Sequence, residues 1–328
     1  MHRKKQPLSA LKENQRIEDV FVVKMKKGLA NYTGGYYFIL ILSDGSGSSM
    51  DYKYWGGPEE ERMRAIYDSI KEDAVVLISG KVQRNRQTGR LEIASNPPIE
   101  FVRPLKDNEY DTDDFIAPPK RPLEEMAAEL KFCVGSVTDH DLKKLLEYFF
   151  AEGSSIASRF LTHPGAIEIH HNWKGGLLQH TLEVVKYCEL TKSLFSDLNR
   201  DILITGALLH DIGKLDEMTV TTRIKGTRHG QLHHHIPLGF AAVSKAMDAL
   251  NTPQLLRDKI LHIIVSHHGQ LEYSSPKPPM FPEAIAVYYA DEMSSKLADV
   301  TETRKKDAAG TEDEFMYSKR HERNMFLR

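Results

Sequence analysis

Histidine and aspartate side chains gather in one region of this chain, at positions where they could bind a metal. The clearest stretch is ITGALLHDIGKLDE (Ile204–Glu217), an almost wholly apolar helical pattern that leads into the adjacent His210 and Asp211. A helix dipole disfavours negative charge near the C-terminus, and a buried ionised carboxylate is costly unless it is paired or binds a metal. A cation beside Asp211 would explain why the buried helix ends there.

Further imidazole and carboxylate side chains occupy comparable positions on other predicted helices. They are His180 near the start of one helix, His235 just before another, His267 and His268 on an apolar stripe, and Asp291. Asp211 and Asp291 both fall at apolar positions, with no Lys or Arg on the same stripe. Neutral imidazole and carboxylate together suit a divalent transition metal.

Each histidine must also be weighed alone. A single buried histidine is more often a hydrogen-bonded core residue than a metal ligand. His163, His229, His233 and His234 are interpreted in that way. An adjacent His-Asp pair, with candidates upstream and downstream on separate helices, is harder to explain by chance.

Two domains are expected to position these side chains, because a chain of 328 residues predicts about two domains. Residues 17–103 show strand patterns and turns in the order strand, strand, strand, helix, strand, strand, which is the order of an OB-fold barrel. Residues 104–121 are acidic and proline-rich, which is typical of a linker. We predict a multidomain protein, a small all-β OB-fold barrel (1–103) followed by an all-α domain (122–306), with a charged tail (307–328).

Eight helices are predicted in the second domain, with one interruption. The Thr- and Val-rich segment 216–232 has a central Gly and is expected to form a hairpin. The helices are predicted near residues 122–133, 138–152, 154–162, 176–195, 200–213, 237–250, 253–268 and 282–306.

Charge and cysteine content restrict the class of protein. Residues 1–103 carry 17 Lys/Arg against 13 Asp/Glu, a mildly basic balance that permits a nucleic-acid partner. No run approaches the roughly 18 apolar residues of a membrane span, and the basic N-terminus lacks the apolar core of a signal peptide. We therefore expect a cytoplasmic protein without a membrane partner. Cys133 and Cys188 are expected to be buried thiols.

The metal-site motifs carry a resemblance to a known family. His180, the HDIGK motif with His210 and Asp211, and Asp291 resemble the signature of HD-domain metal-dependent phosphohydrolases. The stretches HHNWKGGLLQHT, LLHDIGK, SHHGQLEYSSP and YYADEMSSKL resemble the YhaM-type 3′→5′ exoribonucleases, which also carry an N-terminal OB-fold. The resemblance implies an HD domain and the hydrolysis of single-stranded RNA, or DNA, to nucleoside 5′-monophosphates.

The resemblance also implies a centre that holds two metal ions. Ligands of the first position would be His180, His210, Asp211 and Asp291. Ligands of the second position would be Asp211, which bridges the ions, and His235, His267 and His268. Manganese is the preferred metal, and iron, cobalt and nickel suit the same donors.

One ligand of the second position is open to alternatives, because three histidines are consecutive. His233, His234 and His235 all precede the predicted helix. His235 is preferred because it directly opens that helix.

Asp211, Lys214 and His171 are the predicted catalytic residues. Lys214, one helical turn beyond His210, would offset charge on the phosphate in the transition state. Its alternative role is that of a basic residue favoured near a helix C-terminus. His171, together with His170, would line the pocket or support a metal ligand.

The predicted barrel would bind a single strand through aromatic and basic side chains. The candidates are Tyr36, Phe38, Tyr54, Trp55, Lys81, Arg84 and Arg86. About half of the aromatic candidates should belong to the core, because a barrel needs large side chains inside. Tyr36 and Phe38 share one face of their strand and Tyr37 lies on the other, and alternation alone leaves open which face is inside.

Two other functions compete with the exonuclease. An HD hydrolase of small nucleotides or cyclic dinucleotides would leave the OB-fold without a role. A non-catalytic nucleic-acid-binding protein is disfavoured because every ligand that the resemblance implies is present. The sequence is also compatible with a homo-oligomer.

Overall fold

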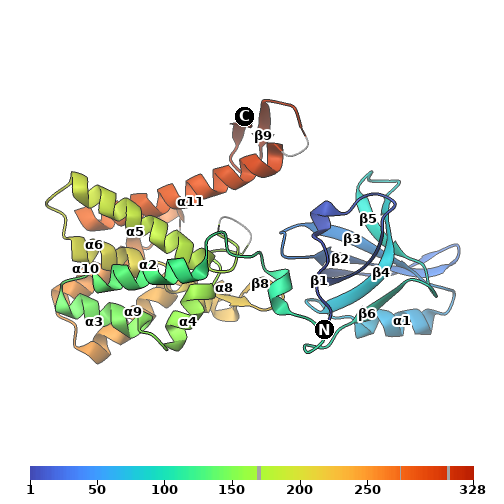
Figure 1. Ribbon diagram of the computed structural model, residues 1–328, viewed down its shortest axis with the longest axis horizontal. Helices are drawn as coiled ribbons and strands as arrows, with labels where there is room; N and C mark the ends of the chain where they lie inside the picture. Colours follow the sequence, from blue (N-terminus) through green and yellow to red (C-terminus); the bar gives the residue numbers. More distant parts are fainter. Residues whose placement is uncertain (168–170, 274, 309–310) are drawn as a thin grey trace. The chain divides into compact units, whose positions relative to one another are not determined.

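The computed structural model describes residues 1–167, 171–273, 275–308 and 311–328. They form two compact units, each with its own hydrophobic core (Figure 1). The first unit contains Met1–Pro118 and Val220–Ile224, and the second contains Pro119–Thr219 and Lys225–Arg328. The prediction of an OB-fold barrel followed by a helical domain is confirmed.

Six strands and one helix form the barrel. They are β1 (Arg16–Tyr32), β2 (Gly35–Ser43), β3 (Ser49–Trp55), α1 (Glu60–Ser69), β4 (Val75–Arg84), β5 (Leu91–Ser95) and β6 (Phe101–Pro104). The pairs β1–β2, β2–β3 and β4–β5 are antiparallel, whereas β3 and β5 are parallel. A further antiparallel pairing between β1 and β4 closes the sheet, which removes most of its unpaired edges.

Alternation along β2 and β3 decides which aromatic rings lie inside the barrel. Phe38, Leu40 and Leu42 on β2 are buried, and so is Tyr54 on β3. The rings of Phe38 and Tyr54 stack, with their centroids 5.2 Å apart. The partly exposed Tyr37 lies on the opposite, outer face of β2.

Much of the predicted linker packs against the barrel. Leu105, Tyr110 and Phe115 are buried in a small apolar cluster with side chains of β1 and β4. The 3-10 turn η2 (Thr112–Phe115) belongs to this segment. Acidic and proline residues dominate its composition, but its three buried side chains contribute to attaching it, because each gains from leaving water.

Ten helices belong to the described part of the second unit. They are α2 (Leu123–Gly135), α3 (His140–Phe150), α4 (Ser155–Thr162), α5 (Gly176–Leu194), α6 (Arg200–Leu209), α7 (Lys214–Glu217), α8 (Arg228–His233), α9 (His235–Leu250), α10 (Gln254–Ser266) and α11 (Pro282–Ala308). The segment predicted as a hairpin contains β7 (Met218–Val220) and β8 (Ile224–Gly226), followed by α8.

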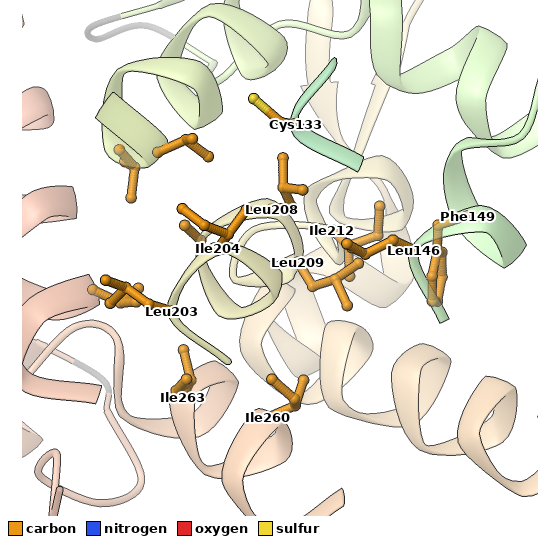
Figure 2. Packing of buried hydrophobic residues seen from close by; sticks show 14 of the residues in the cluster. Cys133, Leu146, Phe149, Leu203, Ile204, Leu208, Leu209, Ile212, Ile260 and Ile263 are labelled. Carbon is orange, nitrogen blue, oxygen red and sulfur yellow. The ribbon is translucent and has the colours of Figure 1, made fainter. Parts of the chain in front are cut away.

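Helix α6 lies at the centre of the helical core. Every residue from Ile202 to Leu209 is buried, and Asn199 caps the helix by accepting a hydrogen bond from the Ile202 amide. Figure 2 shows the α6 side chains between those of α10, such as Ile263, and those of α3, such as Phe149. Because α6 is surrounded, its C-terminal end also lies in the interior, and the side chains that follow it are buried.

The charged tail contains a small hairpin at the end of α11 (Figure 1). Its strands are β9 (Phe315–Ser318) and β10 (Arg323–Phe326). Arg320 in the turn forms an ion pair with Asp299 of α11, with Nε 2.9 Å from Oδ2.

Cys133 and Cys188 are buried and unbonded to each other, as predicted. Of the helices in the described ranges, none combines the length and the apolar character that crossing a bilayer requires.

Candidate metal centre

Asp211 is the residue around which the other candidate ligands gather. It is buried in the turn that follows α6. Gly213 allows α9 to approach this turn, because a Cβ at this position would lie 2.0 Å from the His235 carbonyl oxygen and 2.5 Å from the Gly239 nitrogen. The glycine of HDIGK is therefore needed for the first turn of α9 to reach Asp211.

One carboxylate oxygen of Asp211 faces the ligands predicted for the first position. Oδ2 lies 3.3 Å from His210 Nε2 and 3.5 Å from His180 Nε2. His180 Nε2 is in turn 3.1 Å from Oδ1 of Asp291 on α11. Helices α5 and α11 and the end of α6 thus bring these four side chains together.

The other carboxylate oxygen faces the ligands predicted for the second position. Oδ1 of Asp211 lies 3.4 Å from His235 Nε2 and 3.6 Å from His267 Nε2. Ring nitrogens of His235, His267 and His268 lie within 4.8 Å of one another. Asp211 therefore stands between two groups of imidazoles, one at each oxygen.

Of the three consecutive histidines, His235 is the one with a contact to Asp211 in the described part of the chain. His235 is buried and opens α9, whereas His233 is exposed and the His234 side chain is 45% exposed. The geometry agrees with the choice of His235.

Buried polar atoms without a hydrogen-bond partner show whether a cation would fit beside Asp211. Within the described residues, Asp211 Oδ1, His235 Nε2 and His267 Nε2 are buried without a hydrogen-bond partner. Buried polar atoms are rarely left so, and three that converge on one point need a shared electrophile. A divalent metal would satisfy all three, so the residues fit the group that the HD motif implies.

The opposite ring nitrogens of two histidines are fixed by backbone carbonyls. Nδ1 of His210 lies 2.8 Å from the Ala207 oxygen, and Nδ1 of His267 lies 2.7 Å from the Ile264 oxygen. A carbonyl only accepts, so in each ring Nδ1 carries a proton, and Nε2 is the nitrogen that faces Asp211.

Carboxylates support two further histidines. His235 Nδ1 lies 3.2 Å from each carboxylate oxygen of Glu217, at the end of α7. His180 Nδ1 lies 3.0 Å from Ser294 Oγ, which donates to Glu183 Oε2 at 2.7 Å.

Sequence reasoning missed these three supporting residues. Glu183 and Ser294 each lie three positions after a predicted ligand on the same helix, and Glu217 ends the quoted HDIGK stretch. The i, i+3 spacing was an available signal. No such signal pointed to the contact of Glu217 with α9, because that contact depends on the tertiary fold.

Lys214 forms an ion pair with Asp211. Its Nζ lies 2.6 Å from Asp211 Oδ2, and its side chain is 13% exposed. Burial opposes the ammonium form, but Asp211 outweighs burial and raises the pKa of Lys214. The pairing follows from the turn into α7, which brings a side chain three residues later back to the carboxylate.

Burial and mutual charge set the protonation of the centre. At Asp211 burial opposes ionisation, but Lys214 and His210 outweigh it and hold the pKa well below its usual value. Burial lowers the pKa of His180, and it lowers that of His235 to about 4. Asp211 is therefore ionised at neutral pH while these two imidazoles are neutral, which are the forms that bind a cation.

His171 lies beside the first position and outside the group around Asp211. Its Nε2 is 3.1 Å from Glu183 Oε2, and its ring centroid is 5.2 Å from that of His180. The second pocket-lining candidate, His170, lies outside the described residues. His163 is buried with its Nε2 3.0 Å from the Lys214 carbonyl oxygen, so it acts as a core histidine.

Burial corrects the predicted strand-binding residues of the barrel. Phe38 and Tyr54 are 0% and 6% exposed, so the prediction that they stack on bases is wrong. Tyr36 lies on the same inner face and its hydroxyl donates to Glu60 Oε2 at 2.9 Å. The period of two cannot distinguish the two faces of a strand that carries aromatic residues on both.

Trp55 lies on the outer face of the barrel within an aromatic cluster. Its ring centroid is 4.7 Å from that of Tyr32 and 5.2 Å from that of Tyr37, its cross-strand neighbour. Lys53 Nζ lies 3.9 Å from the centre of the Trp55 ring. The sequence pointed to Trp55 and to Lys53 as strand-binding candidates, but not to the aromatic partners Tyr32 and Tyr37 on this face.

The three basic candidates are exposed. Lys81 and Arg84 lie on β4, and Arg86 lies in the turn toward β5. Arg84 is partly engaged, with its guanidinium 3.2 Å from Glu13 Oε2.

Two family models match the chain, one in each unit. The HD domain matches residues 177–296, which include every candidate ligand from His180 to Asp291. The OB-fold nucleic acid binding domain matches residues 20–96.

Curated relatives are similar to the chain along most of their length. The 3′-5′ exoribonuclease YhaM of Bacillus velezensis is 28% identical over 289 residues, which are 86% of each chain. The protein of the same name from Bacillus subtilis is 26% identical over 288 residues, again 86% of each chain. That of a Geobacillus species is 28% identical over 305 residues, 92% of this chain and 89% of the relative. The resemblance inferred from the motifs is confirmed.

Proposed function

We propose that a chain with this centre and these relatives is a divalent-metal-dependent 3′→5′ exoribonuclease. It shortens single-stranded RNA, or single-stranded DNA, and releases nucleoside 5′-monophosphates. The observation that carries the proposal is the convergence of five histidines and two aspartates in a chain that also has an OB-fold and matches relatives named 3′-5′ exoribonuclease over 86% of its length.

The proposed metal centre has two positions that share Asp211. The first is held by His180, His210, Asp211 and Asp291, and the second by Asp211, His235, His267 and His268. Two divalent ions held there would lower the pKa of a water and offset charge on the leaving oxygen of a phosphodiester. Manganese is proposed because it accepts both imidazole and carboxylate donors.

Lys214 is proposed to hold positive charge where the phosphate enters. Its ammonium group is mostly buried beside Asp211, so it meets a phosphate oxygen without first losing a full hydration shell. His171 is proposed to hold Glu183 in place, which in turn supports His180 through Ser294.

Strand binding is proposed for the outer face of β2 and β3. Tyr37 and Trp55 offer aromatic surfaces for bases, and Lys53 offers a charge for the backbone. Exposed Lys81, Arg84 and Arg86 remain candidates for phosphate contacts. A cytoplasmic location, the absence of a membrane partner and a homo-oligomeric state stay predictions.

A strand labelled at its 5′ end tests the proposal. The protein is incubated with Mn²⁺ and single-stranded RNA beside two variants, His235→Ala and its neighbour His233→Ala. We expect a ladder that shortens from the 3′ end with the wild type and with His233→Ala, because His233 is exposed. We expect no ladder with His235→Ala. Parallel reactions with Fe²⁺, Co²⁺, Ni²⁺ and Mg²⁺ rank the metals.

Two results would contradict the exonuclease. An intact strand together with hydrolysis of small nucleotides or cyclic dinucleotides would identify a small-nucleotide phosphohydrolase. Tight, salt-dependent strand binding without turnover in any divalent metal would identify a binding protein.

A further inference from the structure

The chain supports the histidines of the two proposed metal positions in two ways. His210 and His267 donate through Nδ1 to backbone carbonyls. His235 donates to the Glu217 carboxylate, and His180 reaches the Glu183 carboxylate through a serine hydroxyl. Each proposed position therefore includes one histidine that is backed by negative charge.

A carboxylate changes a histidine ligand more than a carbonyl does. It draws the Nδ1 proton more strongly, which raises the electron density at Nε2 and fixes the ring toward the metal. The effect is local, because it acts on one ring through one hydrogen bond, or through two where a hydroxyl lies between.

We propose that Glu217 and Glu183 are positioning residues that set the affinity of the two metal positions separately. Glu217 acts on the second position through His235, and Glu183 acts on the first through Ser294 and His180. The inference rests on the two-position centre proposed above, and it concerns metal binding whether or not the substrate is RNA.

Within the described residues, Glu217 contacts one proposed metal ligand, His235. Both of its oxygens lie 3.2 Å from His235 Nδ1, and Oε1 also accepts the His235 backbone N–H at 3.0 Å. The carboxylate thus fixes the ring and the start of α9 together.

Glu183 is held by a different set of donors. Its Oε2 accepts from Ser294 at 2.7 Å and lies 3.1 Å from His171 Nε2. Its Oε1 accepts from the Gln179 amide at 3.0 Å. Three neighbours fix this carboxylate on α5, on the side of the centre that contains His180.

A purely structural role of Glu217 and a positioning role predict different metal affinities for Glu217→Gln. A glutamine at position 217 keeps an oxygen that accepts from Nδ1 and from the backbone N–H, so it preserves the cap of α9. It removes only the charge. Metal affinity that depends on charge should therefore fall in Glu217→Gln, whereas affinity that depends only on the hydrogen bond should stay unchanged.

The test measures metal binding without RNA. Metal-stripped full-length protein is titrated with Mn²⁺ and followed by the electron paramagnetic resonance of unbound Mn²⁺, with Co²⁺ absorption as a second readout of the coordination sphere. We expect Glu217→Gln to weaken one of two binding events about 10–100-fold, and Glu183→Gln to weaken the other by a similar factor. The matched control is Glu292→Gln, a glutamate on α11 that forms an ion pair with Lys296.

A second set of variants assigns each effect to its position. His267→Ala should retain the first binding event and lose the second. Adding Glu217→Gln to it should leave the remaining affinity unchanged, whereas adding Glu183→Gln should lower it. Unchanged affinities in Glu217→Gln and Glu183→Gln, or equal losses at both events in each variant, would overturn the inference.

Failure of the proposed function gives a different pattern. If both variants weaken metal binding but the wild type leaves RNA intact, the inference about the glutamates stands and the exoribonuclease proposal is wrong. If the protein cleaves RNA but its metal affinities are unchanged in Glu217→Gln and Glu183→Gln, the exoribonuclease proposal stands and the inference about the glutamates is wrong. Circular dichroism of each variant confirms that the fold is retained before the titration is interpreted.

Discussion

At the scale of residues, Tyr54 and Trp55 are neighbours in sequence with opposite environments. Tyr54 stacks on Phe38 inside the barrel, and Trp55 contacts Tyr32 and Tyr37 outside it. A base can stack on Trp55 and cannot reach Tyr54, because one residue along a strand reverses the face.

Replacing Trp55 should therefore weaken strand binding without unfolding the barrel. We expect Trp55→Ala to lower the affinity for single-stranded RNA by about 1–3 kcal/mol, the range for one stacked base. Fluorescence anisotropy with a labelled strand, in buffer that lacks divalent metal, measures binding without turnover.

Tyr148→Ala is the control for that measurement. Tyr148 is an exposed aromatic residue of α3, 44% exposed, and its removal should leave the affinity unchanged. Equal affinities of Trp55→Ala and wild type would remove the outer face of β2 and β3 from the proposal.

The same residues show what a sequence can and cannot predict. His180, His210, Asp211 and Asp291 were identifiable because buried helices carry polar side chains there, and the structure brings them within a few ångströms. The faces of β2 were not identifiable, because both carry aromatic residues and only closure of the barrel decides which is inside.

At the scale of elements, one carboxylate joins the two residues before α3 to the first turn of α6. Asp201 Oδ2 accepts the Thr138 and Asp139 backbone N–H groups, at 2.9 and 2.6 Å, and the Thr138 hydroxyl at 2.7 Å. Burial opposes ionisation, but these donors outweigh it and lower the pKa of Asp201.

The lowered pKa gives the stabilisation a defined pH dependence. A depressed folded pKa contributes stability that is present above the unfolded pKa, about 3.9, and is lost as pH falls through the folded value. We expect Asp201→Asn to reduce the free energy of unfolding by about 1–2 kcal/mol at pH 7. Urea denaturation should show this difference shrinking below about pH 4.

Asp197→Asn is the matched control, since Asp197 is exposed four residues earlier. It should change stability by less than about 0.5 kcal/mol. A loss in Asp201→Asn that stays constant from pH 7 to pH 3 would show that shape, and not charge, makes this contact stabilising.

Helices were more predictable than the segments that join or follow them. The pattern placed α5 near 176–195 and α11 near 282–306, and the structure has Gly176–Leu194 and Pro282–Ala308. Periodic burial sets such boundaries locally. Leu105, Tyr110 and Phe115 find their partners on β1 and β4, so composition alone suggested a linker where the chain is packed.

At the scale of the whole molecule, metal should stabilise one unit and leave the other unchanged. The proposed ligands all belong to the helical unit, and an ion that binds only the folded state adds about 2.7 kcal/mol at a concentration of 100 times its Kd. We expect Mn²⁺ to raise the midpoint of the helical unit by about 5–10 °C, with the barrel transition unmoved.

Differential scanning calorimetry measures both transitions, and a chelator should reverse the shift. The Asp211→Asn variant identifies the transition, because it should lose the shift while retaining the barrel transition. A shift that persists in Asp211→Asn would place the metal outside this centre.

The proposed ligands are also dispersed along the chain, from His180 on α5 to Asp291 on α11. During synthesis the ribosome releases α11 last among the helices that supply them. A nascent chain whose synthesis has not yet passed α11 lacks Asp291, and its first metal position is incomplete. The capacity to degrade RNA therefore depends on the helix that is translated last among those that supply ligands, so a ribosome that stalls before α11 releases no active nuclease.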